Sequence, residues 1–495
     1  MRVLLIILVV CLSGAVAQAA PLRLTIADAI GRAVEKNLDL GIERYNPAQQ
    51  EAEYQKSRGI YDPTLTFQLE YNDTTSYAAY LASSRYWDRT TQLNAAVSQL
   101  LPSGATASVG FENAYNTAGQ ASSMSGLANY WQSNLGITLN QPLLKNFGRE
   151  PTELTIDTAR LAKEVSLEQL QAKLISTVAQ VRDEYYKLYS LREALEVRRI
   201  SLELARRILS ETQARVKAGV LPAMEVLNAE FGVAGREKDL IDAERAVRDQ
   251  VDVLVRLLQL DPGSEPEIVD MPGKARYVVT EAQEIKRALA NRPELRSLKS
   301  NLSLLELQTR VAENKTLPDL LLSASAATTG LGNTYPKDMD RLSSGNYPAW
   351  GVGLALSYPL GNRAAENEYR KNRLKVEQAA LQLRNQEEQI NTEVRAAVRA
   401  VEANYKQLEV TDRGRAFAEE RLRAWVRKAE VGLATTKDVL DVENDLATAK
   451  DNQIKALVAY AGAITQLWKA TGQILEKEQI SLKVPDPDLL YKRLP

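Results

Sequence analysis

The most constraining feature of the sequence is a seven-residue repeat of apolar side chains. It runs without a break from Leu167 to Val216 and, after a short interruption, resumes from Val226 to Leu254. An uninterrupted heptad repeat predicts helices that pack against other helices along their whole length. The first helix, over roughly residues 152–218, would be about 100 Å long at 1.5 Å per residue. A compact globular domain has no place for such a helix, so the sequence predicts an elongated helical assembly.

The landmarks of the first half of the chain return in the same order in the second half. Leu40 and Pro63 share their spacing with Leu295 and Pro318. Two later motifs also recur: Gln141-Pro142-Leu143 returns as Tyr358-Pro359-Leu360, and Ala218-Gly219-Val220 returns as Val431-Gly432-Leu433. A repeated order of this kind predicts a duplicated architecture.

We therefore expect two structural repeats, residues 20–262 and 280–475, joined by a Pro- and Gly-containing linker at 263–279, the equatorial region, and followed by a C-terminal tail at 476–495. Each repeat should contain a helix, strands, a long helix, a tip and a returning helix. The strands are expected at about 63–72, 91–115 and 131–142 in the first repeat and at 318–328 and 348–358 in the second. The tips are expected near 219–223 and 432–436.

The strand segments alternate apolar and polar side chains. Leu65, Phe67 and Leu69 alternate with polar residues, and Val352, Leu354 and Leu356 alternate with small ones. Segments of nine to eleven residues with one apolar and one polar face are typical of transmembrane β-strands. One chain offers four to six strands, whereas single-chain barrels begin at eight. Because an unpaired sheet edge is not tolerated in lipid, these strands require partner strands from other copies. Three chains of four strands would give twelve, and three of six would give eighteen.

Composition narrows the possible functions. The sequence has no histidine, and its single cysteine, Cys11, lies in an apolar N-terminal run that reads as a signal peptide over residues 1–19. A mature chain without His or Cys excludes imidazole and thiol catalysis and the usual zinc sites. Lys and Arg number 62 against 63 Asp and Glu, without the basic patch of a nucleic-acid-binding protein. No catalytic residue, metal site or cofactor is expected.

The duplicated landmarks resemble those of the TolC-like outer membrane efflux proteins over essentially the whole mature chain. The resemblance lies in the opening Leu24-Thr25-Ile26-Ala27-Asp28, in the paired strand exits and in the two tip sequences. It implies a mainly α-helical fold with a membrane β-barrel portion, in which a homotrimer forms a twelve-stranded barrel and an α-helical tunnel. It also implies an outer-membrane location with the helices in the periplasm, contact with outer-membrane lipid, and docking of a periplasmic adaptor (membrane fusion) protein and an inner-membrane pump.

The resemblance assigns roles to residues at both tips. The adaptor-docking tips would be Gly219, Val220, Leu221, Val431, Gly432 and Leu433. Asp438 and Asp441 match the Asp-Val-Leu-Asp pattern that lines the narrow periplasmic entrance, where threefold symmetry would make anionic rings that attract cations. The first repeat has Glu225 and Asn228 at these positions, so it would add only the Glu225 carboxylate. Ala429 and Ala434 replace the residues that hold the entrance shut in some relatives, so the latch stays unassigned.

The functional interpretation is a passive, gated exit duct of a tripartite efflux pump or a type I secretion system, with no enzymatic activity. Its cargo, whether drug, metal or protein, stays open. An alternative is an exported periplasmic scaffold of coiled coils whose strands form a small soluble sheet. The third class, an enzyme, would have to use carboxylates such as Glu387 and Glu388, whose spacing is better explained by a solvated helix face.

Overall fold

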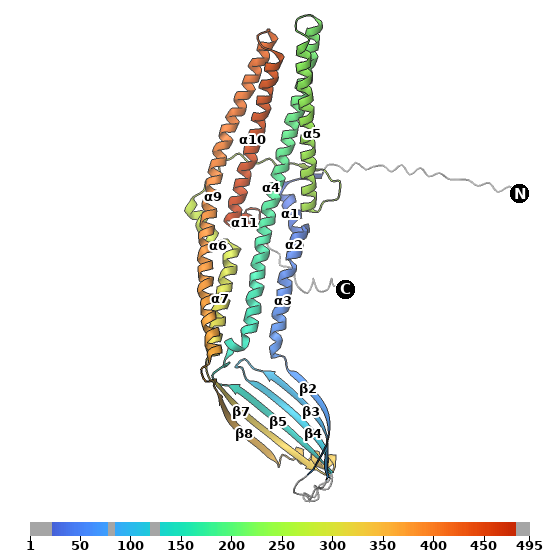
Figure 1. The fold of residues 1–495 in the computed structure, drawn as a ribbon, viewed down its shortest axis with the longest axis vertical. Helices are drawn as coiled ribbons and strands as arrows, with labels where there is room; N and C mark the ends of the chain where they lie inside the picture. The colour runs from blue at the N-terminus through green and yellow to red at the C-terminus, as the bar shows by residue number, and fades with distance from the viewer. Residues whose placement is uncertain (1–21, 78–84, 119–128, 482–495) are drawn as a thin grey trace, which may run out of the picture. The chain divides into compact units, whose positions relative to one another are not determined.

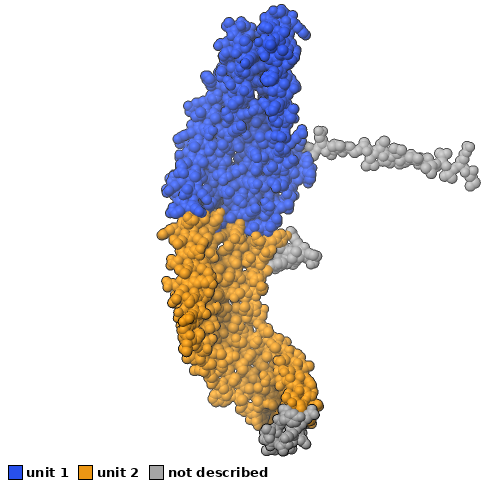
Figure 2. Space-filling model, in the orientation of Figure 1, with its two compact units in different colours: residues 1–44, 170–293, 387–484 blue, residues 45–169, 294–386, 485–495 orange. Residues whose placement is uncertain are grey.

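The structure is a computed structural model that describes residues 22–77, 85–118 and 129–481. The expected signal peptide and most of the expected C-terminal tail lie outside these residues. The chain forms two compact units, which Figure 2 colours separately. Unit 1 contains residues up to 44, 170–293 and 387–484, and unit 2 contains 45–169, 294–386 and the remaining C-terminal residues.

Unit 2 holds a six-stranded antiparallel sheet in the order β2-β3-β4-β5-β7-β8. Figure 1 shows the strands side by side, with β2 and β8 at the two edges. The strands are β2 (Thr64–Tyr77), β3 (Arg85–Leu100), β4 (Thr106–Ala118), β5 (Asn129–Pro142), β7 (Asp319–Gly332) and β8 (Pro348–Ser357). The hairpin β3–β4 therefore belongs to the same sheet as the other strands, and β2, β3 and β7 are longer than the sequence suggested.

The register separates an apolar face from a polar face across the whole sheet. One row of directly paired residues on one face is Leu65, Val97, Val109, Ile137, Ala326 and Trp350. The neighbouring row, on the opposite face, is Thr64, Ser98, Ser108, Thr138, Ser325 and Gly351. Because side chains alternate along a strand, the period-two pattern of each segment becomes one continuous apolar surface.

A short helix that the sequence did not predict, α8 (Tyr335–Ser343), packs against β7 and β5. Two glycines of β7 leave room for its backbone: a Cβ on Gly330 would lie 2.4 Å from the carbonyl oxygen of Asp338. The carboxylate of Asp338, which is fully buried, accepts a hydrogen bond from the hydroxyl of Ser133. The ring of Tyr335 lies 5.2 Å from that of Trp131. This helix therefore covers the apolar face at one end of the sheet.

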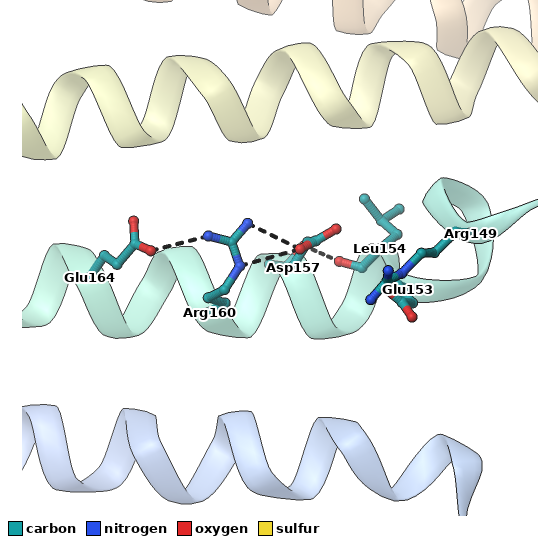
Figure 3. Close-up of polar contacts among 7 residues, drawn as sticks. Arg149, Glu153, Leu154, Asp157, Arg160 and Glu164 are labelled. Carbon is teal, nitrogen blue, oxygen red and sulfur yellow. Dashed lines mark hydrogen bonds and ion pairs between the residues drawn. The ribbon is translucent and has the colours of Figure 1, made fainter. Parts of the chain in front are cut away.

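Besides α8, unit 2 contains the helices α3 (Tyr45–Arg58) and α7 (Pro293–Asn314), which begins one residue before the unit does, and the first turns of α4 (Arg149–Lys217) and α9 (Arg363–Glu430). The exposed face of α4 carries charge pairs at helical spacing, as Figure 3 shows. The guanidinium of Arg160 lies 3.1 Å from carboxylates of both Asp157 and Glu164. Pairs of this kind stabilise an exposed helix face and form no convergent site.

Unit 1 is built from the later parts of α4 and α9 with α1 (Ile26–Lys36), α2 (Leu38–Glu43), α5 (Met224–Leu258), α6 (Glu281–Asn291), α10 (Thr436–Ala470) and α11 (Ile474–Lys477). Its core includes heptad residues of α4, among them Leu174, Val181 and Leu188. The returning helices α5 and α10 each contain 35 residues. The long helices α4 and α9 contain 69 and 68 residues.

The segment expected as an irregular linker is fixed to unit 1. Within it, β6 (Pro266–Ile268) pairs in parallel with β1 (Leu22–Leu24), a two-stranded sheet that the sequence did not predict. The hydroxyl of the buried Tyr185 donates to the carbonyl of Leu24 at 2.8 Å and accepts from the N–H of Asp270, within the linker, at 3.1 Å. The hydroxyl of the buried Tyr460 donates to the carbonyl of Ala275 in the linker at 2.8 Å. The linker therefore has a defined position through backbone pairing and two tyrosine anchors.

The predicted fold class, mainly helical with a strand portion and a repeated order of elements, is confirmed. No helix among the residues that the structure describes is both long enough and apolar enough to cross a bilayer. The predicted first helix of each repeat is divided: α1, α2 and α3 replace one helix, and α6 and α7 the other. Pro293, the first residue of α7, explains the second break, because proline donates no backbone hydrogen bond.

Candidate functional site: the two helical tips

The two tips end their long helices with the same backbone motif. After α4, Gly219 has a φ of 76°, its N–H donates to the carbonyl of Val216, and the N–H of Val220 donates to that of Arg215, each at 2.9 Å. After α9, Gly432 has a φ of 80°, and the N–H of Leu433 donates to the carbonyl of Lys428 at 2.8 Å, the equivalent of the Val220 bond. This is the Schellman arrangement, in which glycine takes the left-handed position. Both tip glycines therefore take the positive φ that a tight turn after a helix favours.

The helices that follow the tips begin differently. Thr435 forms a capping box with Asp438, in which the Asp438 N–H donates to the threonine hydroxyl at 3.1 Å and the Thr435 N–H donates to the carboxylate at 2.8 Å. At the start of α5, Ala223 provides no side-chain cap. The hydrogen bonds from the Thr435 side chain and backbone lower the pKa of Asp438, because they favour its ionised form. Asp438 therefore stays charged, and it also holds the first turn of α10.

Unit 1 contains two helical hairpins, α4–α5 and α9–α10. Most of the predicted tip residues line one groove between these two hairpins. The groove has a volume of about 830 Å³, and its lining includes Val220, Leu221, Glu225, Gly432, Leu433 and Asp438. Arg215 crosses it, since its Nη1 donates to the carbonyl of Ala429 at 3.2 Å. The structure thus brings six of the nine predicted site residues to one place, although they come from chain segments about 200 residues apart.

The other three predicted residues, Gly219, Val431 and Asp441, are exposed and do not line the groove. The Glu225 side chain is half-buried, and its Oε2 is enclosed without a hydrogen-bond partner among the described residues. Val220 and Leu433, which follow the glycines, are 70% and 77% exposed. Two apolar side chains held outward on identical turns form a small contact surface at the tips.

Sequence reasoning missed an ion pair that joins the two hairpins. On α5, the Arg236 guanidinium donates from Nε and Nη2 to the Glu443 carboxylate of α10, at 2.9 and 2.6 Å. The same Nη2 also donates to the carbonyl of Leu440 at 3.0 Å. The two charged side chains are only 15% and 6% exposed. The only sequence signal was that Glu443 falls on an otherwise apolar helix face, and nothing in the sequence identified its partner 207 residues away.

A second, partly buried ion pair joins the hairpins, between Arg198 of α4 and Asp451 of α10. Burial raises the pKa of Asp451, and the positive charge of Arg198 opposes that effect. By contrast, the exposed pair of Arg206 and Glu237, 2.7 Å apart, lies within the first hairpin. We call the Arg236–Glu443 and Arg198–Asp451 pairs the hairpin clamp. Over residues 22–77, 85–118 and 129–481, no group of three metal-ligating side chains is found.

Comparison with known proteins agrees with this arrangement. Residues 29–259 and 285–473 match the outer membrane efflux protein family. The chain is 25% identical to the outer membrane efflux protein BepC of Brucella suis biovar 1 over 361 residues, which is 72% of this chain and 76% of BepC. It is also 25% identical to the pyoverdine export outer membrane protein OpmQ of Pseudomonas aeruginosa over 322 residues, which is 63% of this chain and 64% of OpmQ.

The fold matches solved structures as well. The outer-membrane channel OprN superposes with a TM-score of 0.68 at 15% identity, covering 90% of each chain. The two matched segments of the family together contain both hairpins, the six-stranded sheet and the tips. The chain therefore belongs to the outer membrane efflux protein family.

Proposed function

We propose that three copies of this chain form the exit duct of a tripartite efflux pump or a type I secretion system, a passive conduit gated at its periplasmic end. The protein resides in the outer membrane with its helical part in the periplasm. The observation that carries the proposal is the pairing, in one chain, of a sheet with one continuous apolar face and two helical hairpins with exposed apolar tips. We assign no catalytic step to the chain.

The apolar face of the sheet also favours the channel over the alternative of a soluble periplasmic scaffold. Leu65, Leu69 and Leu354 are each about two-thirds exposed or more on that face. A large exposed apolar surface on a soluble protein would drive aggregation, whereas lipid covers it at no such cost. The scaffold interpretation requires a protein that stays in aqueous buffer without detergent, and we expect the purified chain to need detergent.

The charge at the tips supports a cation-preferring entrance. In a threefold assembly the carboxylates of Asp438, Asp441 and Glu225 would recur three times around the narrow end, and rings of like charge concentrate counter-ions. In planar bilayers we expect the protein to conduct cations over anions, and we expect Asp441→Asn to lower the cation-to-anion permeability ratio severalfold. Asp438→Asn should act in the same direction.

The capping box offers a matched control for this experiment. Thr435→Ala removes the threonine hydroxyl bonded to Asp438 and weakens the start of α10 by about 1 kcal/mol, but keeps the carboxylate. If selectivity comes from charge, Thr435→Ala keeps the cation preference and Asp438→Asn reduces it. Unchanged selectivity in both aspartate variants would contradict the proposed entrance.

We further propose that the exposed tips dock a periplasmic adaptor protein, through which an inner-membrane pump is engaged. Val220 and Leu433 sit at equivalent positions of the two turns and present apolar side chains outward. A photo-reactive amino acid at either position should cross-link an adaptor in the native host. Position Val410 of α9, which is 64% exposed but lies away from the tips in the sequence, is the matched control. Equal capture from Val410 and Leu433 would count against tip docking.

A further inference from the structure

The six-stranded sheet of one chain ends in two edges that fit each other. Among the described residues, β2 pairs only with β3 and β8 pairs only with β7. Because the sheet is antiparallel throughout and has an even number of strands, β2 and β8 run in opposite directions. The β8 edge of one copy can therefore continue the antiparallel pattern into the β2 edge of another copy.

The side chains of both edges continue the same apolar face. On β2 they are Leu65, Phe67, Leu69 and Tyr71, and on β8 they are Trp350, Val352, Leu354 and Leu356, with exposed fractions from 62% to 81%. Same-face residues inside the sheet, such as Leu135 at 44% and Val109 at 48%, are more covered by neighbouring strands. If each edge pairs with a strand of another copy, the exposed fractions of its side chains should fall to those found inside the sheet.

The strands of the sheet are offset along their length in the way that a closed barrel requires. The row of pairs that starts at Thr64, the first residue of β2, reaches Gly351 on β8. The strand β8 itself continues to Ser357. The offset across the sheet is therefore about one residue per strand, and a barrel whose shear equals its number of strands has strands tilted by about 36°. Closed barrels usually have tilts of about 35–45°.

We propose that β8 of one copy pairs with β2 of the next with Ser357 opposite Thr64. Leu356 then faces Leu65, Leu354 faces Phe67, Val352 faces Leu69 and Trp350 faces Tyr71. A register shifted by two residues in one direction would place Trp350 opposite Asp73, and a shift in the other direction would place Leu356 opposite Pro63, outside β2. Either shift would leave uneven strand ends. This inference rests on the proposed three-copy channel, and with three copies the six strands per chain close into eighteen.

Eighteen strands differ from the twelve that the family resemblance implied. Because barrel diameter grows roughly linearly with strand number, the barrel would be about 1.5 times as wide, with roughly twice the cross-section. The additional strands are β3 and β4, the hairpin inserted between β2 and β5. Barrels of about this size leave an aqueous channel, so the outer-membrane end of the duct would admit wider cargo than a twelve-stranded barrel.

A disulfide between copies tests the register. Directly opposite residues in an antiparallel pair have Cα atoms about 4.5–5.5 Å apart, within the range that a disulfide spans, whereas diagonal neighbours are about 7–8 Å apart. In a Cys11→Ser background, the Leu69→Cys, Val352→Cys pair should give covalent dimers and trimers on oxidation that disappear on reduction. The Leu69→Cys, Leu354→Cys pair, which is diagonal in the proposed register, should give at least tenfold less covalent dimer and trimer.

The outcomes separate this inference from the proposed function. Trimers that conduct in bilayers but form no Val352–Leu69 cross-link would overturn the seam and leave the channel standing. Preferential cross-linking of Leu69 to Leu354 would overturn the register. A protein that forms neither trimers nor channels would contradict the proposed function itself. Exclusion of polymers of graded size from the open channel gives a second measurement, since a twelve-stranded end should exclude polymers that an eighteen-stranded end admits.

Discussion

Arg236→Ala should raise the conductance of the reconstituted channel and shift it toward an open state. The substitution leaves Glu443, only 6% exposed, without its cation, and removes the bond to the Leu440 carbonyl. Breaking a buried ion pair by removing one partner costs roughly 3–5 kcal/mol. If that cost falls only on the closed arrangement, in which α5 and α10 touch, the ratio of open to closed protomers rises by roughly 100-fold or more. Single-channel recording measures the change directly.

A matched control lies on the same hairpin. Arg206→Ala also removes an arginine from an ion pair, but that pair is exposed and joins α4 to α5 within the first hairpin. Exposed pairs contribute about 0–1 kcal/mol, so the closed state should keep its population. Glu443→Gln, which retains side-chain volume, should behave like Arg236→Ala. Stable trimers in which Arg236→Ala and Arg206→Ala conduct alike would show that the hairpin clamp does not hold the entrance shut.

Ile137→Arg should abolish accumulation of the folded protein in the outer membrane. Ile137 lies at the centre of the sheet on the apolar face, where it is 57% exposed. An arginine on the lipid-facing side near the bilayer midplane costs roughly 2–4 kcal/mol per chain, and three chains pay that cost together. Such a cost is comparable with the whole stability of many proteins, about 5–15 kcal/mol. Heat-modifiable oligomer in outer-membrane fractions is the measurement.

The adjacent residue provides the control. Thr138 lies on the polar face, where its hydroxyl forms a hydrogen bond with that of Ser108. Thr138→Arg loses that bond, which contributes about 0.5–1.5 kcal/mol, but places its charge on the polar face, which lines the water-filled interior of the proposed channel. The oligomer should persist at a reduced level. Equal loss from both variants would mean that the apolar face does not meet lipid.

The fold class could be predicted because its signals are periodic. Heptads over some fifty residues and alternation over ten identify helices and strands without knowledge of tertiary contacts. The paired glycine tips were predictable for the same local reason, since a left-handed turn after a helix favours glycine. By contrast, α8 and the β1–β6 pair are short, and their stability comes from what they pack against. The only sequence sign of α8 was the pair of glycines Gly330 and Gly332, which leave space for its backbone.

The candidate site was predicted in part. The family resemblance assigned Asp438 to the periplasmic entrance, and that role stays a prediction. The Thr435-x-x-Asp438 spacing also reads as a capping box, which the structure shows. The hairpin clamp could not be predicted, because a charge pair between segments some 200 residues apart depends on how the hairpins pack. In the same way, Tyr185 and Tyr460 carry no local sign that their hydroxyls hold the linker.

The Arg236–Glu443 pair of the clamp is not duplicated in the way that the tips are. The two repeats are offset by the spacing between Gly219 and Gly432. By this offset, the position in the first repeat that corresponds to Glu443 is Glu230, an exposed glutamate of α5. The position in the second repeat that corresponds to Arg236 is Ala449, which is uncharged. In the proposed three-copy ring, this ion pair would join the two hairpins within each chain, and the equivalent positions could not form the same pair between chains. Opening of the proposed channel would then require the three Arg236–Glu443 pairs, one in each chain, to break, and this is the step that Arg236→Ala should favour.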